Sequence, residues 1–138
     1  MIMPVFAVDN IDASIDFYTN KLGFALTFSL PGPDGTPAFA FVNLGQSLNI
    51  GLSKQPGLSE KGKGSVLMCY VPDETDLDQY YSEVIANGVA IDTPIQDQYW
   101  GDRTFQLTDP DGFVLQFAKT TKQVDMADIE ATMRGSGQ

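Results

Sequence analysis

The sequence contains no histidine, and this absence limits the catalytic and metal-binding side chains that the chain can offer. Histidine is the commonest general base near neutral pH and a frequent ligand of zinc, iron and nickel, so histidine-dependent hydrolysis and metal mechanisms are excluded. Catalysis would have to use Asp, Glu, Tyr, Lys or Cys. The single cysteine, Cys69, is expected on the buried side of a strand, which favours an inert thiol over a nucleophile.

The strongest candidate for ligand binding is the segment Gln98-Tyr99-Trp100-Gly101-Asp102-Arg103. A Trp and a Tyr beside a hinge-capable glycine could close over a site and hold an aromatic or cationic ligand, with Arg103 in the charged pair that follows. Trp, Tyr and Arg are also enriched at protein interfaces, so packing against a second copy is the competing interpretation. Asp97 and Asp102 could attract a cation or act as a base, although carboxylates in a polar loop are usually just solvated.

Composition narrows the classes of partner. The 138 residues are 43% hydrophobic, which is enough to bury the core of one domain. With 18 acidic and 8 basic residues the net charge is −10, so nucleic acid is a poor partner. We find no apolar run of membrane-spanning length and no basic, apolar leader at the start, and we therefore predict a cytoplasmic protein.

The elements that would position these side chains follow from periodicity. Residues 2–8 form a β-branched and aromatic run, and apolar residues then recur at helical spacing from Ile11 to Leu22, with Gly23 as a stop and Asp9 or Asn10 as a cap. Three strands should follow, separated by Gly- and Pro-containing turns: 24–30, 36–43 and 47–52. The predicted order is βαβββ.

The same order repeats after a polar connector, residues 53–63. A strand at 65–71 precedes a second helical pattern from Leu77 to Gly88, with the same spacing and the same terminal glycine. The remaining strands are expected at 89–92, 102–108 and 113–118, the last two joined by a type I turn at Asp109-Pro110-Asp111-Gly112. Residues 124–133 are predicted to form a terminal helix.

Three sequence pieces carry a family resemblance: Ser14-Ile15-Asp16-Phe17-Tyr18, Lys21-Leu22-Gly23-Phe24, and Asp109-Pro110-Asp111-Gly112-Phe113 leading to Gln116. In this order around a duplicated βαβββ pattern, they resemble the glyoxalase/bleomycin-resistance/dioxygenase (vicinal oxygen chelate) superfamily. The resemblance implies an α+β domain at residues 1–118, with modules at about 2–53 and 64–118. Their mixed β-sheet would form an open cup, usually within a homodimer. Residues 119–138 would be a C-terminal arm.

The resemblance also implies where family enzymes hold a metal, on the first and last strands of each module. These positions are Met3, Asn49, Val66 and Gln116 here. None is His, Asp or Glu, and a thioether, two amides and an aliphatic chain do not offset dehydration of a divalent ion. We therefore expect no metal and no cofactor.

Strand alternation predicts which side chains line the cup, because residues two apart share a face. Apolar and amide groups should dominate, which suits a small organic ligand held by shape and oriented by hydrogen bonds. Phe39 and Phe41 share one face and could stack on a flat ligand or belong to the core. The candidate ligand-binding residues are Trp100, Tyr99, Gln116, Asn49, Tyr70, Met68, Phe39, Phe41 and Arg103.

The sequence favours a metal-free protein that binds a small organic molecule and sequesters an antibiotic or metabolite. One alternative is a glyoxalase-like lyase or extradiol-type dioxygenase with a non-standard active site. Another is an accessory or regulatory module whose residues 119–138 dock another protein. Fold alone does not decide between them.

Overall fold

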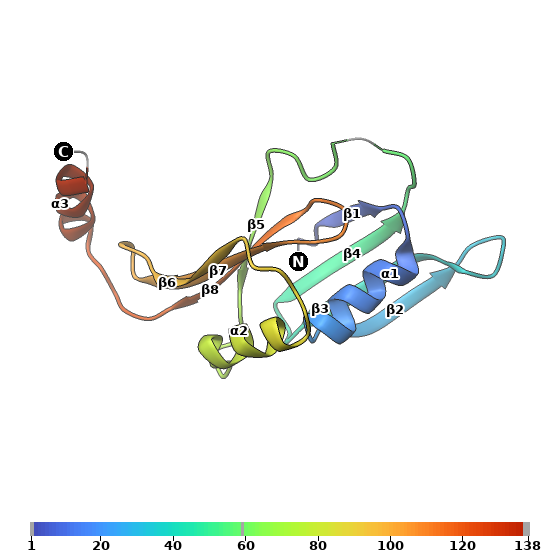
Figure 1. The fold of residues 1–138 in the computed structure, drawn as a ribbon, viewed down its shortest axis with the longest axis horizontal. Coiled ribbons are helices and arrows are strands. Elements are labelled where there is room, and N and C mark those ends of the chain that lie inside the picture. The colour runs from blue at the N-terminus through green and yellow to red at the C-terminus, as the bar shows by residue number, and fades with distance from the viewer. Residues whose placement is uncertain (1, 59, 137–138) are drawn as a thin grey trace.

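The first module is a βαβββ unit in the computed structural model, which describes residues 2–58 and 60–136 (Figure 1). Its strands form a four-stranded sheet in the order β1-β4-β3-β2, with β1 parallel to β4 and the other neighbours antiparallel. Its elements are β1 (Val5–Val8), α1 (Ile11–Asp16), the π-helical turn η1 (Phe17–Lys21), β2 (Ala25–Pro31), β3 (Pro37–Leu44) and β4 (Leu48–Lys54).

The second module repeats this plan with the strand order β5-β8-β7-β6. Its elements are β5 (Val66–Tyr70), α2 (Leu77–Ala86), β6 (Thr93–Asp97), β7 (Asp102–Thr108) and β8 (Val114–Thr120). The predicted α+β fold with two βαβββ modules and open mixed sheets is therefore confirmed. A last helix, α3 (Met126–Ser136), follows β8 and lies beyond the end of the second sheet (Figure 1). None of the helices within the described residues is long and apolar enough to cross a membrane.

Local signals set the ends of both module helices. The side chain of Asn10 accepts a hydrogen bond from the Ala13 amide, and the side chain of Asp76 does the same for Gln79 at the start of α2. Gly23 and Gly88 follow the two helices with φ of 76° and 89°. This left-handed conformation is strained for a residue with a Cβ, so glycine ends each helix.

One predicted strand was misplaced. Residues 89–92 lie before the ladder: the Asp92 amide bonds to the carbonyl of Gln106, but regular pairing with β7 begins at Thr93. Val89 and Ile91 instead pack, half-buried, against the core. The apolar character of Val89 and Ile91 therefore reflects packing on the core. The strand itself is β6, at the edge of the second sheet, where a proline such as Pro94 is tolerated.

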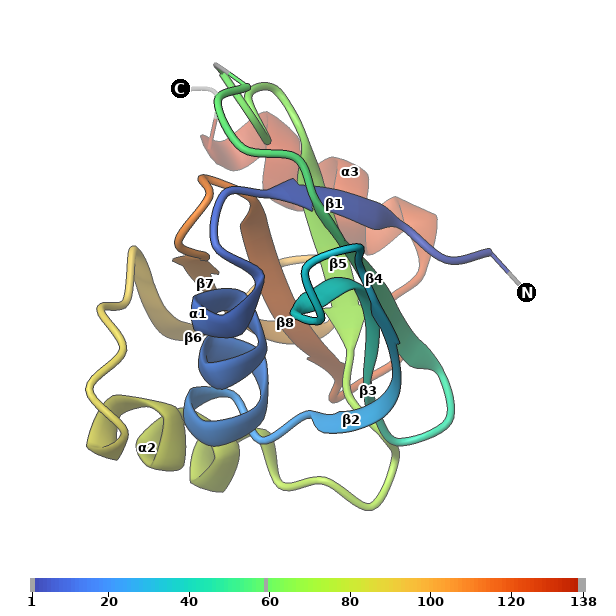
Figure 2. The same cartoon turned by 90° about the vertical axis from the view of Figure 1, so that its right-hand side faces the viewer.

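The two modules share one hydrophobic core. α1 packs on β3 and β4, while Tyr80 and Tyr81 of α2 contact the ring of Phe105. Across the modules, Phe6 stacks on Phe113 with ring centroids 4.0 Å apart. The end of the first module's helix lies next to α2 (Figure 2), where the Tyr80 hydroxyl donates to the carbonyl of Leu22 at 2.6 Å.

The connector between the modules is fixed against the β7–β8 turn. The Lys61 ammonium pairs with Asp111 of that turn at 3.1 Å, and both side chains are buried. Asp111 also accepts hydrogen bonds from the Asp9 amide and the Ser14 hydroxyl of the first module. Through these contacts of Asp111, the β7–β8 turn holds the first module, the connector and the second module together.

The faces of the sheets opposite α1 and α2 have a different character. Six large apolar side chains on β1, β2 and β5 are 39–56% exposed there, although most strand residues on the helix side are buried. They are Val5, Phe28, Leu30, Val66, Met68 and Tyr70. We call the uncovered surfaces the open faces of the first sheet (β1–β4) and of the second sheet (β5–β8).

Candidate functional site

Strand register assigns the residues of the second sheet's open face. Met68 of β5 lies beside Gln116 of β8, which lies beside Gln106 of β7. Cross-strand partners point to the same side of a sheet, so these three residues form one row. The next two rows are Tyr70, Ala118 and Thr104, then Thr120 and Asp102.

Asp102 is the polar centre of this face. Its Oδ2 accepts hydrogen bonds from the Tyr70 hydroxyl at 2.7 Å and from Nε1 of Trp100 at 2.8 Å. Its Oδ1 accepts from the Thr120 hydroxyl at 2.8 Å. The residue is only 4% exposed. Burial by itself would raise the pKa of Asp102, but the hydrogen bonds from Tyr70, Thr120 and Trp100 outweigh it and lower that pKa, so the carboxylate stays ionised.

The turn that carries Trp100 is fixed by the C-terminal arm. The Gly101 carbonyl accepts hydrogen bonds from the backbone amides of Thr121 and Lys122, and from the Thr121 hydroxyl. Gly101 has φ of 102°, and a Cβ there would collide with the Lys122 carbonyl. The glycine predicted as a hinge therefore holds Tyr99 and Trp100 in place at this close approach of two backbones.

Two amide side chains meet one hydroxyl on the same face. Gln98 and Gln116 both donate to Oγ1 of Thr104, at 3.0 and 3.4 Å, and Thr104 itself is buried. These contacts hold the two glutamines in position. Gln98 was predicted only as part of the segment around Trp100, and Thr104 was not among the predicted site residues, although strand alternation places Thr104 on the same face as Asp102.

The open face of the first sheet is aromatic instead of polar. The ring of Phe41 contacts those of Phe28 and Phe39, with centroids 5.1 and 5.2 Å apart. The Phe39 ring covers Gly51, where a Cβ would lie 3.1 Å from Cζ of Phe39 and from Cγ2 of Val5. The absence of a side chain at Gly51 lets the phenylalanines lie close to the sheet.

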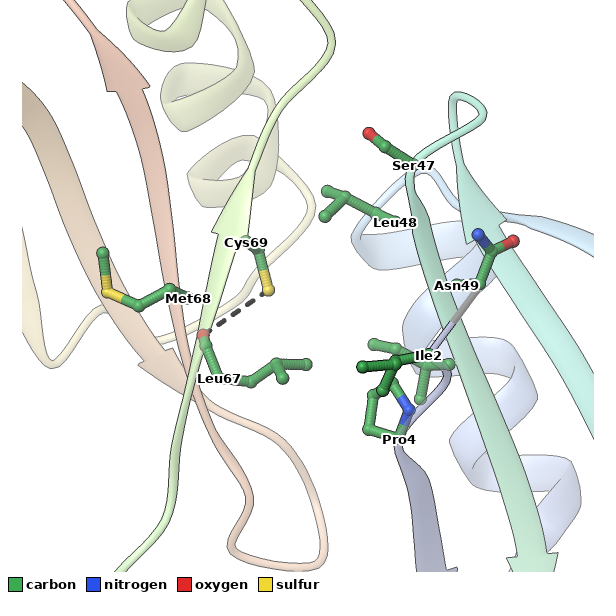
Figure 3. Close-up of a pocket in the computed structure, with 9 residues that line it drawn as sticks. Ile2, Pro4, Ser47, Leu48, Asn49, Leu67, Met68 and Cys69 are labelled. Carbon is green, nitrogen blue, oxygen red and sulfur yellow. Dashed lines mark hydrogen bonds between the residues drawn. The ribbon is translucent and has the colours of Figure 1, made fainter.

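A hollow of about 220 Å³ lies at the seam between the modules (Figure 3). Leu48 of β4 and Leu67 and Cys69 of β5 point into it, while Met68 points the other way. The Cys69 thiol is buried, and desolvation raises its pKa to about 12, so it remains protonated and unreactive. This hollow is smaller than the roughly 300–1,000 Å³ of typical ligand pockets, and Ile50 and Cys69 in its wall belong to the shared core.

The predicted site residues fall into three places. Trp100, Tyr70, Gln116 and Met68 lie together on or beside the open face of the second sheet, and Tyr99 contacts Trp100 edge-on with ring centroids 5.0 Å apart. Phe39, Phe41 and Asn49 lie on the open face of the first sheet. Arg103 lies on the helix side of β7, paired with Asp78 of α2 at 2.8 Å and with Asp97 at 3.1 Å.

The four positions that the family resemblance assigns to a metal do not offer suitable ligands here. Asn49 and Gln116 offer amides, Met3 a thioether and Val66 no donor atom. Within residues 2–58 and 60–136, no group of three or more Cys, Asp or Glu side chains is placed to hold a metal ion. A divalent ion needs anionic or imidazole ligands to offset its dehydration, so this donor set is unsuitable.

Comparison with known proteins agrees with this architecture. The model of the Glyoxalase/Bleomycin resistance protein/Dioxygenase superfamily matches residues 2–117. An uncharacterized protein of Mycobacterium tuberculosis is 26% identical over 140 residues, which covers 97% of this chain and 82% of that protein.

Two solved structures are similar across most of their length. TioX from Micromonospora sp. ML1 superposes with a TM-score of 0.69 at 22% identity, covering 91% of this chain and 99% of TioX. TnmS3, an antibiotic binding protein from Streptomyces sp. CB03234, superposes with a TM-score of 0.66 at 25% identity, covering 86% of this chain and 93% of TnmS3.

Proposed function

This chain belongs to the Glyoxalase/Bleomycin resistance protein/Dioxygenase superfamily, and we propose that it binds a small organic molecule without a resident metal. The observation that carries the proposal is the open face of the second sheet. It presents aromatic and amide side chains held by defined hydrogen bonds, among them Gln116, which stands where the family resemblance implies a metal ligand. Such a surface suits binding by shape and orientation.

The expected ligand is an antibiotic or a comparable metabolite, held intact. TnmS3 is described as an antibiotic binding protein, and its fold covers most of this chain. The described site offers no histidine base and no reactive thiol, and its one buried carboxylate already accepts three hydrogen bonds. Sequestration in the cytoplasm requires none of these groups to react.

A second copy of the chain would complete the site. The open face of the second sheet is polar around Asp102, whereas that of the first sheet is aromatic around Phe41. Both faces also expose large apolar side chains, a pattern typical of protein interfaces. In our proposal the first sheet of one protomer faces the second sheet of its partner, and the ligand lies between them.

Native mass spectrometry of the purified protein tests these proposals together, because it reports oligomer, metal and organic ligand in one measurement. We expect a dimer free of metal that carries or takes up an organic molecule. Gln116→Leu should weaken uptake, while the matched change Gln79→Leu on the outer side of α2 should not. One tightly held metal per protomer, surviving a chelator, would overturn the proposal and favour the lyase or dioxygenase alternative.

A further inference from the structure

We propose that the ligand of this protein is an organic cation, a protonated amine on a flat apolar body, selected by the buried charge of Asp102 through Tyr70 and Trp100. This inference rests on the proposed function and specifies its ligand class. Three features of the second sheet's open face support it: an unbalanced buried charge, the direction of the hydrogen bonds to it, and the arrangement of the rings.

The charge of Asp102 has no cationic partner among the residues that the structure describes. Neutral donors satisfy its oxygens, and no ion pair formed by the described residues includes it. The nearest basic residues along β7 and β8 are engaged on the helix side: Arg103 with Asp78 and Asp97, and Lys119 with the Thr75 carbonyl. A buried anion without a counter-ion leaves a negative potential in its surroundings, which a bound cation would relieve.

The hydrogen-bond direction brings this charge to the surface of the face. Tyr70 donates its only hydroxyl hydrogen to Asp102, and this hydrogen bond raises the pKa of Tyr70, so the hydroxyl keeps its proton. The phenolic oxygen can then offer only its lone pairs to a ligand. Because Tyr70 is 45% exposed, an N–H group of a ligand can reach it, whereas a ligand carboxylate would be repelled.

The rings beside Asp102 suit the same class of ligand. Nε1 of Trp100 is held by Asp102, and the ring of Tyr99 meets that of Trp100 at 88°. Two perpendicular rings form a corner, and a cation over a ring face is attracted by its π-electrons. Behind Tyr70, the exposed Met68 provides apolar contact for the body of the ligand.

The test uses three probes of one shape and different charge: benzylammonium, benzyl alcohol and benzoate. Trp100 is the only tryptophan in the chain, so its fluorescence reports binding at this site directly. At constant ionic strength we expect benzylammonium to bind about tenfold more tightly than benzyl alcohol, and benzoate to bind most weakly.

Variants assign the preference to Asp102. Asp102→Asn keeps the size of the side chain and removes its charge, and it should bring benzylammonium and benzyl alcohol within about twofold of each other. The control is Asp97→Asn at the end of β6, whose carboxylate pairs with Arg103 on the helix side of the sheet and is 73% exposed; it should leave the preference intact. If Asp102→Asn does not fold, Tyr70→Phe decides, because it removes the accepting oxygen and keeps the carboxylate. It should reduce the preference by at least about threefold.

The outcomes separate this inference from the proposed function. Equal binding of benzylammonium and benzyl alcohol to the wild type would overturn the charge selection while supporting a small-molecule site. A preference that survives both Asp102→Asn and Tyr70→Phe would also overturn it. If none of the probes changes the fluorescence, and native mass spectrometry finds no organic ligand, the proposed function fails as well.

Discussion

Tyr18 of the first module donates its phenolic hydrogen to Oδ2 of Asp109 in the second module, with 2.7 Å between the oxygens. Tyr18 is fully buried and Asp109 is 5% exposed. The other carboxylate oxygen, Oδ1, accepts hydrogen bonds from the backbone amides of Asp111 and Phe113. A carboxylate that closes the β7–β8 turn thus also joins the modules, which relates two sequence motifs that lie 91 residues apart.

Replacing Tyr18 by phenylalanine should destabilise the protein more than the same replacement at Tyr80. Tyr18→Phe removes a hydrogen bond to a buried carboxylate, and we expect a loss of about 1.5–3 kcal/mol in the free energy of unfolding at neutral pH. Tyr80 is also buried, but its hydroxyl donates to a neutral carbonyl, that of Leu22, so the expected loss is about 0.5–1.5 kcal/mol. Urea denaturation of both variants measures the difference, and equal losses would contradict a special role for the Asp109 charge.

Asp109 should also make stability depend on pH. Desolvation raises its pKa in the folded protein, against the hydrogen bonds from Tyr18, Phe113 and Asp111. A raised folded pKa means that the stabilising contribution is complete below the ordinary carboxyl pKa and is lost as the pH rises through the folded value. As the pH rises from below the ordinary carboxyl pKa to above the folded pKa of Asp109, the stability of the wild type relative to Asp109→Asn should therefore fall and then level off. Urea midpoints across that range test this, and a relative stability that rises with pH would show the opposite sign.

Gly101→Ala should disturb both stability and the environment of Trp100. The added Cβ would require a left-handed backbone and collide with the Lys122 carbonyl, so we expect a loss of at least about 2 kcal/mol. The control is Gly88→Ala, where φ is also positive but the space is open; strain alone should cost about 1 kcal/mol. Only Gly101→Ala should shift the Trp100 emission. An unchanged spectrum in a folded Gly101→Ala variant would mean that the arm does not position this ring.

Most of the fold could be predicted from the sequence because its signals are local. The helical spacing from Ile11 and from Leu77, the terminal glycines and the Asp109-Pro110-Asp111-Gly112 turn each act within a few residues. Strand β6 was misplaced because Val89 and Ile91 are apolar for a tertiary reason, packing on the core outside the ladder. A pattern of hydrophobicity does not distinguish these two causes.

The candidate site could be predicted only in part. Alternation placed Tyr70 and Gln116 on one face, and the segment with Trp100 was identified from its composition. The meeting of Tyr70, Trp100 and Thr120 at one carboxylate depends on three strands or turns and has no local signal. Arg103 was predicted as a ligand contact because it follows Trp100 and Asp102 in the sequence. Neighbouring side chains of a strand point to opposite faces, so Arg103 lies on the helix side, away from Asp102.

The exposed apolar side chains of the open faces predict that the protein dimerises through them. Phe28→Glu would place a charge among the phenylalanines of the first sheet, and we expect it to raise the dimer dissociation constant by about 30-fold or more. Ile85→Glu on α2 is a matched control, because the two side chains are 44% and 45% exposed, and it should leave dimerisation unchanged. Sedimentation equilibrium measures both constants. If Phe28→Glu changes the dimer dissociation constant no more than Ile85→Glu does, the open face of the first sheet is not the dimer interface.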